Sequence, residues 1–306
     1  MMRRREFFGI VAAMPAAAAL PLNLSSVKSR TIKSWELGYK TPHPKPNALD
    51  ITKEGMWIVD QGPETWVSLV NIPDGKVIRE FKVPDAVGST GVHVDADNVM
   101  WITGTHNSMI VSCSPVDGKV IAKYWTPGAG RIFQMKGDPA GRVSTLKPAY
   151  PDEGGQGRGP QGAGGRQGAR GGRGGGLGPG QLPMDATTGM GGTGAHAIVS
   201  KGNLLYYVCP PARQIFTIDK KTWEVQAAWF VPGNRPHGMT WDENHESLWN
   251  ADSNLNAFYG FNIKTGDIFE KVQLPDDSPV VHGAKLHDGY MLMCDDVGWM
   301  WRVKWA

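Results

Sequence analysis

The sequence of 306 residues is poor in cysteine, in charge of one sign and in long apolar runs. Its three cysteines are too few for a disulfide scaffold or for a zinc ribbon held by cysteine alone. A formal net charge of +3, from 32 basic and 29 acidic residues, excludes a strongly basic nucleic-acid binder of the usual kind. The hydrophobic share of 41% excludes a wholly disordered chain.

The N-terminal 24 residues hold an apolar run of moderate length. A basic start that includes Arg4-Arg5-Glu6-Phe7-Phe8 precedes an Ala-rich stretch with Ala17-Ala18-Ala19. This order is typical of a signal peptide, and the arginine pair resembles the twin-arginine export motif. An ordinary secretory signal or an N-terminal anchor helix is the alternative. We expect residues 1–24 to be removed, leaving a periplasmic or secreted protein with no stable membrane span.

Helical periodicity is missing after residue 30, and a β-rich repeat of about 43 residues stands in its place. Apolar cores recur at Trp57, Trp101, Tyr206, Trp249 and Leu292, and turns rich in Asp, Asn and Gly keep the same interval. Four short strands in every 40–50 residues are typical of a β-propeller blade.

The interval between Trp101 and Tyr206 is 105 residues, which we interpret as two periods with about 19 extra residues. This predicts a hidden blade with inner strands near residues 131–135 and 142–146. The last blade has only three strands, and residues 31–37 can supply its fourth. We therefore expect an all-β, six-bladed propeller over residues 31–306, with four-stranded antiparallel blades and a ring closed by an N-terminal strand.

Residues 154–180 contain 15 glycines and 4 arginines, inside an insertion over residues 151–192 that we place in blade 3. Such a composition cannot bury a core, so we expect a flexible loop. An RGG-like nucleic-acid segment is the alternative. Since an exported protein rarely meets RNA, we expect no nucleic-acid partner.

Three histidines occupy one level of the repeat, at the start of the innermost strand in successive blades. They are His196, His237 and His282, and Asn47 has that place in the first blade. Inner strands line the centre of a propeller, so these side chains should converge. Three neutral imidazoles with room for water can hold a catalytic divalent metal, with zinc favoured over calcium or iron. Polar residues that only fill the centre are the alternative.

Further polar residues are expected on the same face. Asp60, Asp252 and Asp295 follow their core strands; they either orient the histidines, act as general base, or only cap the next turn. Asn47, His93 and Arg131 are candidate substrate contacts, the arginine for an anionic group. The three cysteines, Cys113, Cys209 and Cys294, all lie in apolar runs, so we expect buried, inert thiols.

Two short motifs carry a family resemblance. Arg235-Pro236-His237-Gly238 and Gly178-Pro179-Gly180-Gln181-Leu182 resemble motifs of the NHL-type six-bladed propeller superfamily, in particular its streptogramin-lyase-like and peptidylglycine-amidating-lyase-like members. The amidating lyases carry three histidines on a catalytic zinc with an arginine nearby. The resemblance implies these roles for His196, His237, His282 and Arg131, although the family's histidines are more widely separated in sequence.

The sequence thus predicts an exported propeller enzyme. We expect a metal-assisted lyase or hydrolase that acts on a small polar molecule or peptide where the histidines converge. The alternative is a non-catalytic binding or scaffold propeller for protein, peptide or glycan partners, since a fold alone does not fix a function.

Overall fold

Short strands dominate the fold, because β-branched and aromatic residues alternate with turn-forming Asn, Asp and Gly. The computed structural model describes residues 24–132, 134–146, 177–189 and 191–306. In these ranges the chain forms 21 strands and a short 3-10 helix, η1 (Leu24–Ser26). The predicted signal peptide, apart from Leu24, and most of the Gly-rich stretch lie outside the described residues. Within the described ranges, no helix has the length and apolarity needed to cross a membrane.

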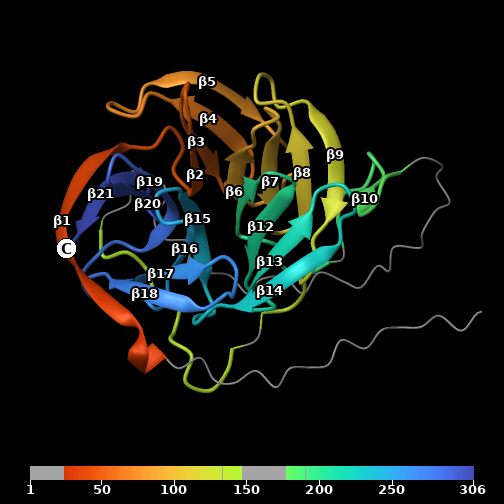
Figure 1. Cartoon of the computed structure of the whole chain (residues 1–306). Coiled ribbons are helices and arrows are strands. Elements are labelled where there is room, and N and C mark those ends of the chain that lie inside the picture. Colours follow the sequence, from red (N-terminus) through yellow and green to blue (C-terminus); the bar gives the residue numbers. More distant parts are fainter. Residues whose placement is uncertain (1–23, 133, 147–176, 190) are drawn as a thin grey trace, which may run out of the picture.

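The described strands form five antiparallel blades around one axis (Figure 1). Blade 1 is β2 (Pro46–Thr52), β3 (Gly55–Asp60), β4 (Trp66–Val70) and β5 (Val77–Lys82). Blade 2 is β6 (Ser89–Val94), β7 (Met100–Gly104), β8 (Met109–Cys113), β9 (Val120–Trp125) and the added β10 (Gln181–Leu182). Blade 3 is β11 (Ala197–Lys201), β12 (Leu204–Cys209), β13 (Gln214–Asp219) and β14 (Val225–Phe230).

The last two blades belong to one continuous sheet. Blade 4 is β15 (Pro236–Asp242), β16 (Ser247–Asp252), β17 (Ala257–Asn262) and β18 (Ile268–Gln273). Blade 5 is β19 (Val281–His287), β20 (Tyr290–Asp295), β21 (Trp299–Trp305) and the N-terminal β1 (Lys28–Lys40). In Figure 1 the first strand of each blade lies near the centre, while β5, β9, β14, β18 and β1 form the rim.

The N-terminal strand β1 completes the ring, as the sequence indicated. It pairs antiparallel with β21, with Trp35 opposite Val303. Its first residues also pair in parallel with β18 of blade 4, with Lys28 opposite Glu270. One strand therefore holds two blades together at the rim.

The sixth blade predicted from the sequence is not present in the described residues. The inner strands contact one another in a closed circle, β2 with β6, then β11, β15 and β19, which returns to β2. A Cβ built on Gly91 of β6 would lie 3.1 Å from the Cα of Ala197 in β11, so blades 2 and 3 are direct neighbours. The described residues at 131–132, 134–135 and 142–146 form no strand. The long interval is one period plus an excursion that leaves blade 2 and adds β10 to its rim.

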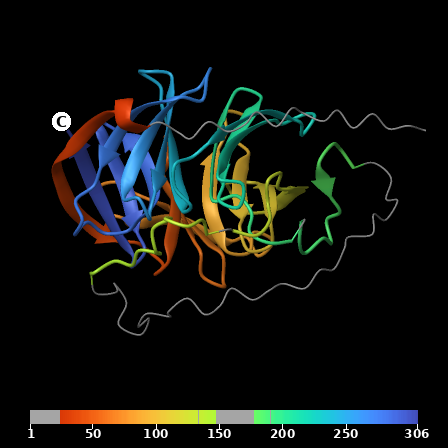
Figure 2. The same ribbon diagram turned by 90° about the horizontal axis from the view of Figure 1, so that it is seen from below.

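The excursion crosses the face of the ring on which the inner strands begin, which we call the entry face. Residues 134–146, the strap, contact turns of three blades there. Asp138 pairs with Arg213 at 3.3 Å, the Arg142 amide donates to Asn254 Oδ1 at 3.1 Å, and the Ser144 amide donates to Asp296 Oδ2 at 3.1 Å. Figure 2 shows this yellow-green segment running along one face of the ring.

Apolar side chains from facing sheets pack between neighbouring blades and form the core. The three cysteines are free thiols buried in this core, as expected from the sequence. Burial raises the pKa of Cys113 and of Cys209 to about 12, so both stay protonated and unreactive.

Candidate functional site

The structure brings the three predicted histidines together on the entry face. The ring centroids of His196 and His237 lie 4.8 Å apart with the rings tilted by 51°, and those of His237 and His282 lie 4.8 Å apart with the rings stacked at 19°. The three residues are 8%, 3% and 7% exposed. We call His196, His237 and His282 the histidine cluster.

β-Bulges at the start of the inner strands orient two of these histidine side chains. The pairing shifts register between Pro236 and Met239 in blade 4, and between Val281 and Ala284 in blade 5. His237 and His282 are therefore extra residues of bulges, and a bulge re-aims the side chain that it carries. Blades 1 and 2 have the same shift, so Asn47 and Thr90 hold the equivalent places, and His196 directly precedes β11.

Hydrogen-bond partners fix the tautomer of His237. Its Nδ1 lies 2.7 Å from Ser253 Oγ and 3.2 Å from the Arg235 carbonyl. The Ser253 hydroxyl donates to the Val281 carbonyl at 2.5 Å, so it accepts from the imidazole. Nδ1 therefore carries the hydrogen, and the lone pair of the neutral ring is on Nε2.

Arg235 fixes the same tautomer in His282. Its Nη2 lies 3.2 Å from His282 Nε2, and because a guanidinium can only donate, Nε2 is an acceptor. Nδ1 of His282 therefore carries the hydrogen and donates to the Pro46 carbonyl at 3.3 Å. The Asn47 amide nitrogen lies 3.2 Å from the same Nδ1; since both are donors, Asn47 lies against this ring without a hydrogen bond to it.

The histidine cluster is electrically neutral at its centre. Burial first, and then the neighbouring His282, His196 and Arg235, lower the pKa of His237 well below its usual value. At ordinary pH the imidazole is therefore uncharged and can accept a proton.

The three predicted aspartates, Asp60, Asp252 and Asp295, accept hydrogen bonds mainly from backbone amides of their own blades. Asp60 accepts from the amides of Lys45 and Gly62, at 2.6 and 2.7 Å. Asp252 accepts from three amides, those of Arg235, Asn254 and Leu255. Burial raises the pKa of Asp252 against these donors. Capping of the following turn, one of the expectations from the sequence, accounts for the contacts with Gly62, Asn254 and Leu255. The Lys45 and Arg235 amides instead come just before the inner strand of the same blade.

Asp295 is also a turn cap, and it binds a tryptophan as well. It accepts from the amides of Val297 and Trp299 and from Trp301 Nε1, each at 2.8 or 2.9 Å. Burial raises its pKa to about 6 against these donors. None of these hydrogen bonds reaches the histidine cluster.

Two charged residues next to Arg235 each have a buried side-chain atom without a hydrogen-bond partner among the described residues. They are Arg142, at Nη1, and Asp296, at Oδ1. Arg142 belongs to the strap, and its carbonyl accepts from Arg235 Nη1 at 2.8 Å. Unsatisfied buried polar atoms mark a place where a polar ligand or water can bind.

The predicted substrate contact Arg131 is exposed, in the loop after blade 2. Arg235, immediately before the Pro-His-Gly motif, is the arginine that contacts the cluster, and sequence reasoning missed this role. The signal was its place in the motif itself. His93, the other predicted contact, lies further along its inner strand and is described below.

The donor chemistry of the cluster suits a metal, but its arrangement does not form a ready site. The neutral rings of His237 and His282 direct Nε2 lone pairs away from their backbone-bound Nδ1 atoms, which is typical of metal ligands. However, Arg235 already occupies Nε2 of His282 with a cation. Among the described residues, no group of three His, Cys, Asp or Glu is arranged to hold a metal ion.

A cleft of about 860 Å³ lies away from the cluster, between the rims of blades 1 and 5. Its walls include Tyr39, Glu54, His287, Tyr290 and Trp301. None of the predicted site residues lines it.

Comparisons with known proteins find solved structures with a similar fold, but they assign the chain to no family. The chain is similar in structure to glutaminyl cyclase of Myxococcus xanthus, with a TM-score of 0.55, 6% identity, and coverage of 91% of this chain and 98% of that one. Virginiamycin B lyase of Staphylococcus aureus has a TM-score of 0.44 at 17% identity, covering 87% of this chain and 69% of that one. A streptogramin B lyase has 0.43 at 16%, covering 89% and 98%.

At 6% identity the first likeness shows the fold alone, and the other two are too distant to carry an argument. No family model matches the sequence, and no curated protein matches it.

Proposed function

We propose that the chain is a propeller enzyme, a lyase or hydrolase that acts on a small polar substrate with an anionic group at the entry face. The observation that carries this proposal is the row Arg235, His282, His237 and His196, in which a guanidinium adjoins three nearly buried imidazoles, with the neutral His237 at their centre. Guanidinium groups bind carboxylates and phosphates in a defined orientation, and neutral imidazoles move protons.

In this proposal the cationic residues bind the substrate and the neutral imidazole transfers the proton. Arg235 and the buried Nη1 of Arg142 supply donors for the anionic group of the substrate. His237, with its lone pair on Nε2, takes a proton from the substrate or from a water molecule. Because its surroundings disfavour a positive charge, the protonated ring readily returns that proton to the leaving group.

Turnover in two variants tests this proposal. The substrate panel consists of small carboxylate-bearing amides and of acids with a leaving group in the β position. His237→Asn should lower kcat about 100-fold or more, because a general base is lost. Arg235→Gln should chiefly raise KM. Arg302→Gln, an exposed arginine of β21 outside the histidine cluster, is the matched control and should leave both constants unchanged.

Unchanged turnover in His237→Asn would overturn the proposed chemistry. Absence of turnover over the whole panel, together with binding of glycans or peptides, would favour the scaffold alternative.

Binding of a divalent metal by the histidine cluster stays a prediction. Elemental analysis of chain folded in the cell tests it. About one equivalent of zinc that disappears in His237→Asn would support metal assistance. Less than about half an equivalent, unchanged in the variant, would leave the imidazoles as acid–base groups. Export also stays a prediction, and cell fractionation with the Arg4-Arg5 pair replaced by lysines tests it.

A further inference from the structure

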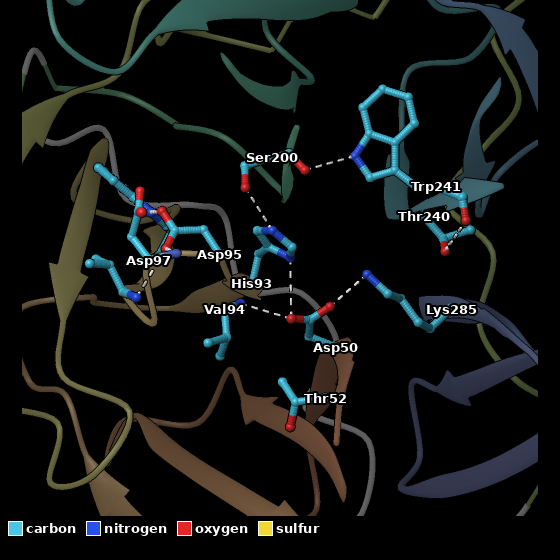
Figure 3. A network of polar contacts seen from close by, with 12 residues as sticks. Asp50, Thr52, His93, Val94, Asp95, Asp97, Ser200, Thr240, Trp241 and Lys285 are labelled. Carbon is cyan, nitrogen blue, oxygen red and sulfur yellow. Dashed lines mark hydrogen bonds and ion pairs between the residues drawn. The ribbon is translucent and has the colours of Figure 1, made fainter. Parts of the chain in front are cut away.

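A second polar cluster lies deeper along the inner strands, toward the face where these strands end. It joins four blades: Asp50 of β2, His93 of β6, Ser200 of β11 and Lys285 of β19 (Figure 3). Ser200 follows His196 by four residues, which is about 13 Å along an extended strand. The second cluster is therefore separate from the histidine cluster and does not depend on it.

Asp50 is the fixed centre of this second cluster. Its side chain is 2% exposed, with Lys285 Nζ 2.5 Å from Oδ1 and the Val94 amide 2.8 Å from Oδ2. Burial by itself raises the pKa of Asp50, but Lys285 and His93 outweigh burial and hold it well below its usual range. The carboxylate is thus ionised and can only accept hydrogen bonds.

The ionised carboxylate sets the direction of His93. Its Nδ1 lies 3.2 Å from Asp50 Oδ2, at ion-pair distance but without the alignment of a hydrogen bond. Because an ionised carboxylate cannot donate, it favours the tautomer with the hydrogen on Nδ1. His93 Nε2 lies 2.9 Å from Ser200 Oγ. In the neutral ring, Nε2 then accepts the hydrogen of the serine hydroxyl.

This polarity distinguishes Ser200 from other serines of the described chain. Ser89, Ser108 and Ser253 donate their hydroxyls to backbone carbonyls. Ser200 instead faces the basic nitrogen of an imidazole whose other nitrogen is held by a buried carboxylate. It is half-buried and one residue from the end of β11.

We propose that Ser200, His93 and Asp50 form a nucleophilic site for acyl transfer, with small carboxylic esters as its substrate class. Ser200 Oγ attacks the ester carbonyl carbon while its proton passes to His93 Nε2. The bond to the alcohol oxygen then breaks, and that oxygen takes the proton from His93. Water, deprotonated by His93, hydrolyses the acyl-serine and restores the hydroxyl. Asp50 holds the ring in the required tautomer, and Lys285 keeps Asp50 ionised.

A tagged alkyl fluorophosphonate, applied to the intact protein, tests the proposal. The Ser200 oxygen forms a bond to phosphorus, fluoride leaves, and the proton passes to His93. Mass spectrometry should map one adduct to Ser200. Ser200→Ala should abolish it, and His93→Gln should slow labelling about 100-fold or more. Ser34→Ala, a half-buried serine on the rim strand β1, is the matched control and should label like the wild type.

A second readout guards against loss of fold. Ser200→Ala removes only one hydroxyl, and its thermal unfolding should match that of the wild type. Hydrolysis of p-nitrophenyl acetate should show an initial burst in the wild type and none in Ser200→Ala. An adduct at another residue, or labelling and burst unchanged in Ser200→Ala, would overturn the proposal.

Discussion

The two levels of the ring centre are built on the same inner strands but have opposite electrostatics. At the entry face, His237 lies among other histidines and an arginine, and no carboxylate in the described contacts pairs with its ring. About 10 Å along the same strands, His93 adjoins the ionised Asp50, which Lys285 neutralises.

The difference shows that neighbouring groups set the charge state of the imidazole at the entry face and can set the orientation of the imidazole at the deeper level. Where only burial and like charges act, as at His237, the neutral form is favoured. Where an ammonium keeps a carboxylate ionised, as at Asp50, the carboxylate can orient a neighbouring ring. The scaffold supplies matching backbone positions, and a few side chains set the chemistry.

Removal of Lys285 should have the largest effect on stability. Lys285→Ala leaves the carboxylate of Asp50 buried without its ammonium partner, and we expect a loss of about 3–5 kcal/mol in the free energy of unfolding. Chemical denaturation followed by tryptophan fluorescence measures it.

Two further variants, a control at an exposed lysine and a double replacement of the buried pair, test whether the loss of stability comes from the unpaired carboxylate. Lys53→Ala, on a turn, should change stability by less than about 0.5 kcal/mol. Asp50→Leu combined with Lys285→Met should recover most of the loss, since apolar residues of similar volume replace a buried pair well. A small loss in Lys285→Ala would mean that Asp50 does not need its partner.

As the pH falls, the contribution of the entry face to stability should decrease before that of the second cluster. An unfolded histidine titrates near pH 6.5, and the folded pKa of His237 is much lower, so acid favours the unfolded state. The contribution of His237 is complete above about pH 6.5. Below that, it falls by up to about 1.4 kcal/mol per pH unit. Asp50 keeps its contribution until the pH falls below about 4, because its folded pKa is depressed.

Denaturation of wild type and His237→Asn at pH 7 and pH 5 isolates this slope. Asp295 acts in the opposite direction, because its pKa of about 6 in the fold favours folding as the pH falls from 6 toward 4. That term is common to both proteins and cancels in the difference. A stability difference between them that does not change with pH would contradict a neutral, buried His237.

Of these three predictions, replacement of Ser253 should change the free energy of unfolding least. Ser253→Ala removes one acceptor from His237 Nδ1 but leaves the Arg235 carbonyl. We expect a loss of about 1 kcal/mol and an unchanged tautomer, measured by denaturation and by the nitrogen chemical shifts of the imidazole. A shift of the hydrogen to Nε2 would show that the hydroxyl alone fixes the tautomer.

The repeat was readable from the sequence because each blade repeats its aromatic core and its turn at one interval. That interval also placed His196, His237 and His282 at one level, and it left residues 31–37 to close the ring. The blade count failed because 105 residues accommodate either two periods or one period with a long excursion. Spacing alone does not distinguish a weak blade from a strap.

The contacts between blades were not readable. Arg235 is two residues from His237, yet its guanidinium reaches His282 of the next blade. Likewise, Asp50, His93 and Ser200 come from three blades, and their meeting depends on how far each inner strand is shifted along the ring axis. Such shifts arise from packing between sheets, which a one-dimensional period does not record.

The pairing of β1 with both β18 and β21 has a consequence for biosynthesis. Residues 28–40 are synthesised before both of their partner strands, so the full clasp cannot form until β21 has been translated. Blades 1 to 4 can assemble in order as they emerge, while the first strand waits. Closure of the ring therefore depends on a contact between segments far apart in the sequence, a kind of contact that slows folding, and a truncation that removes β1 would leave the ring open.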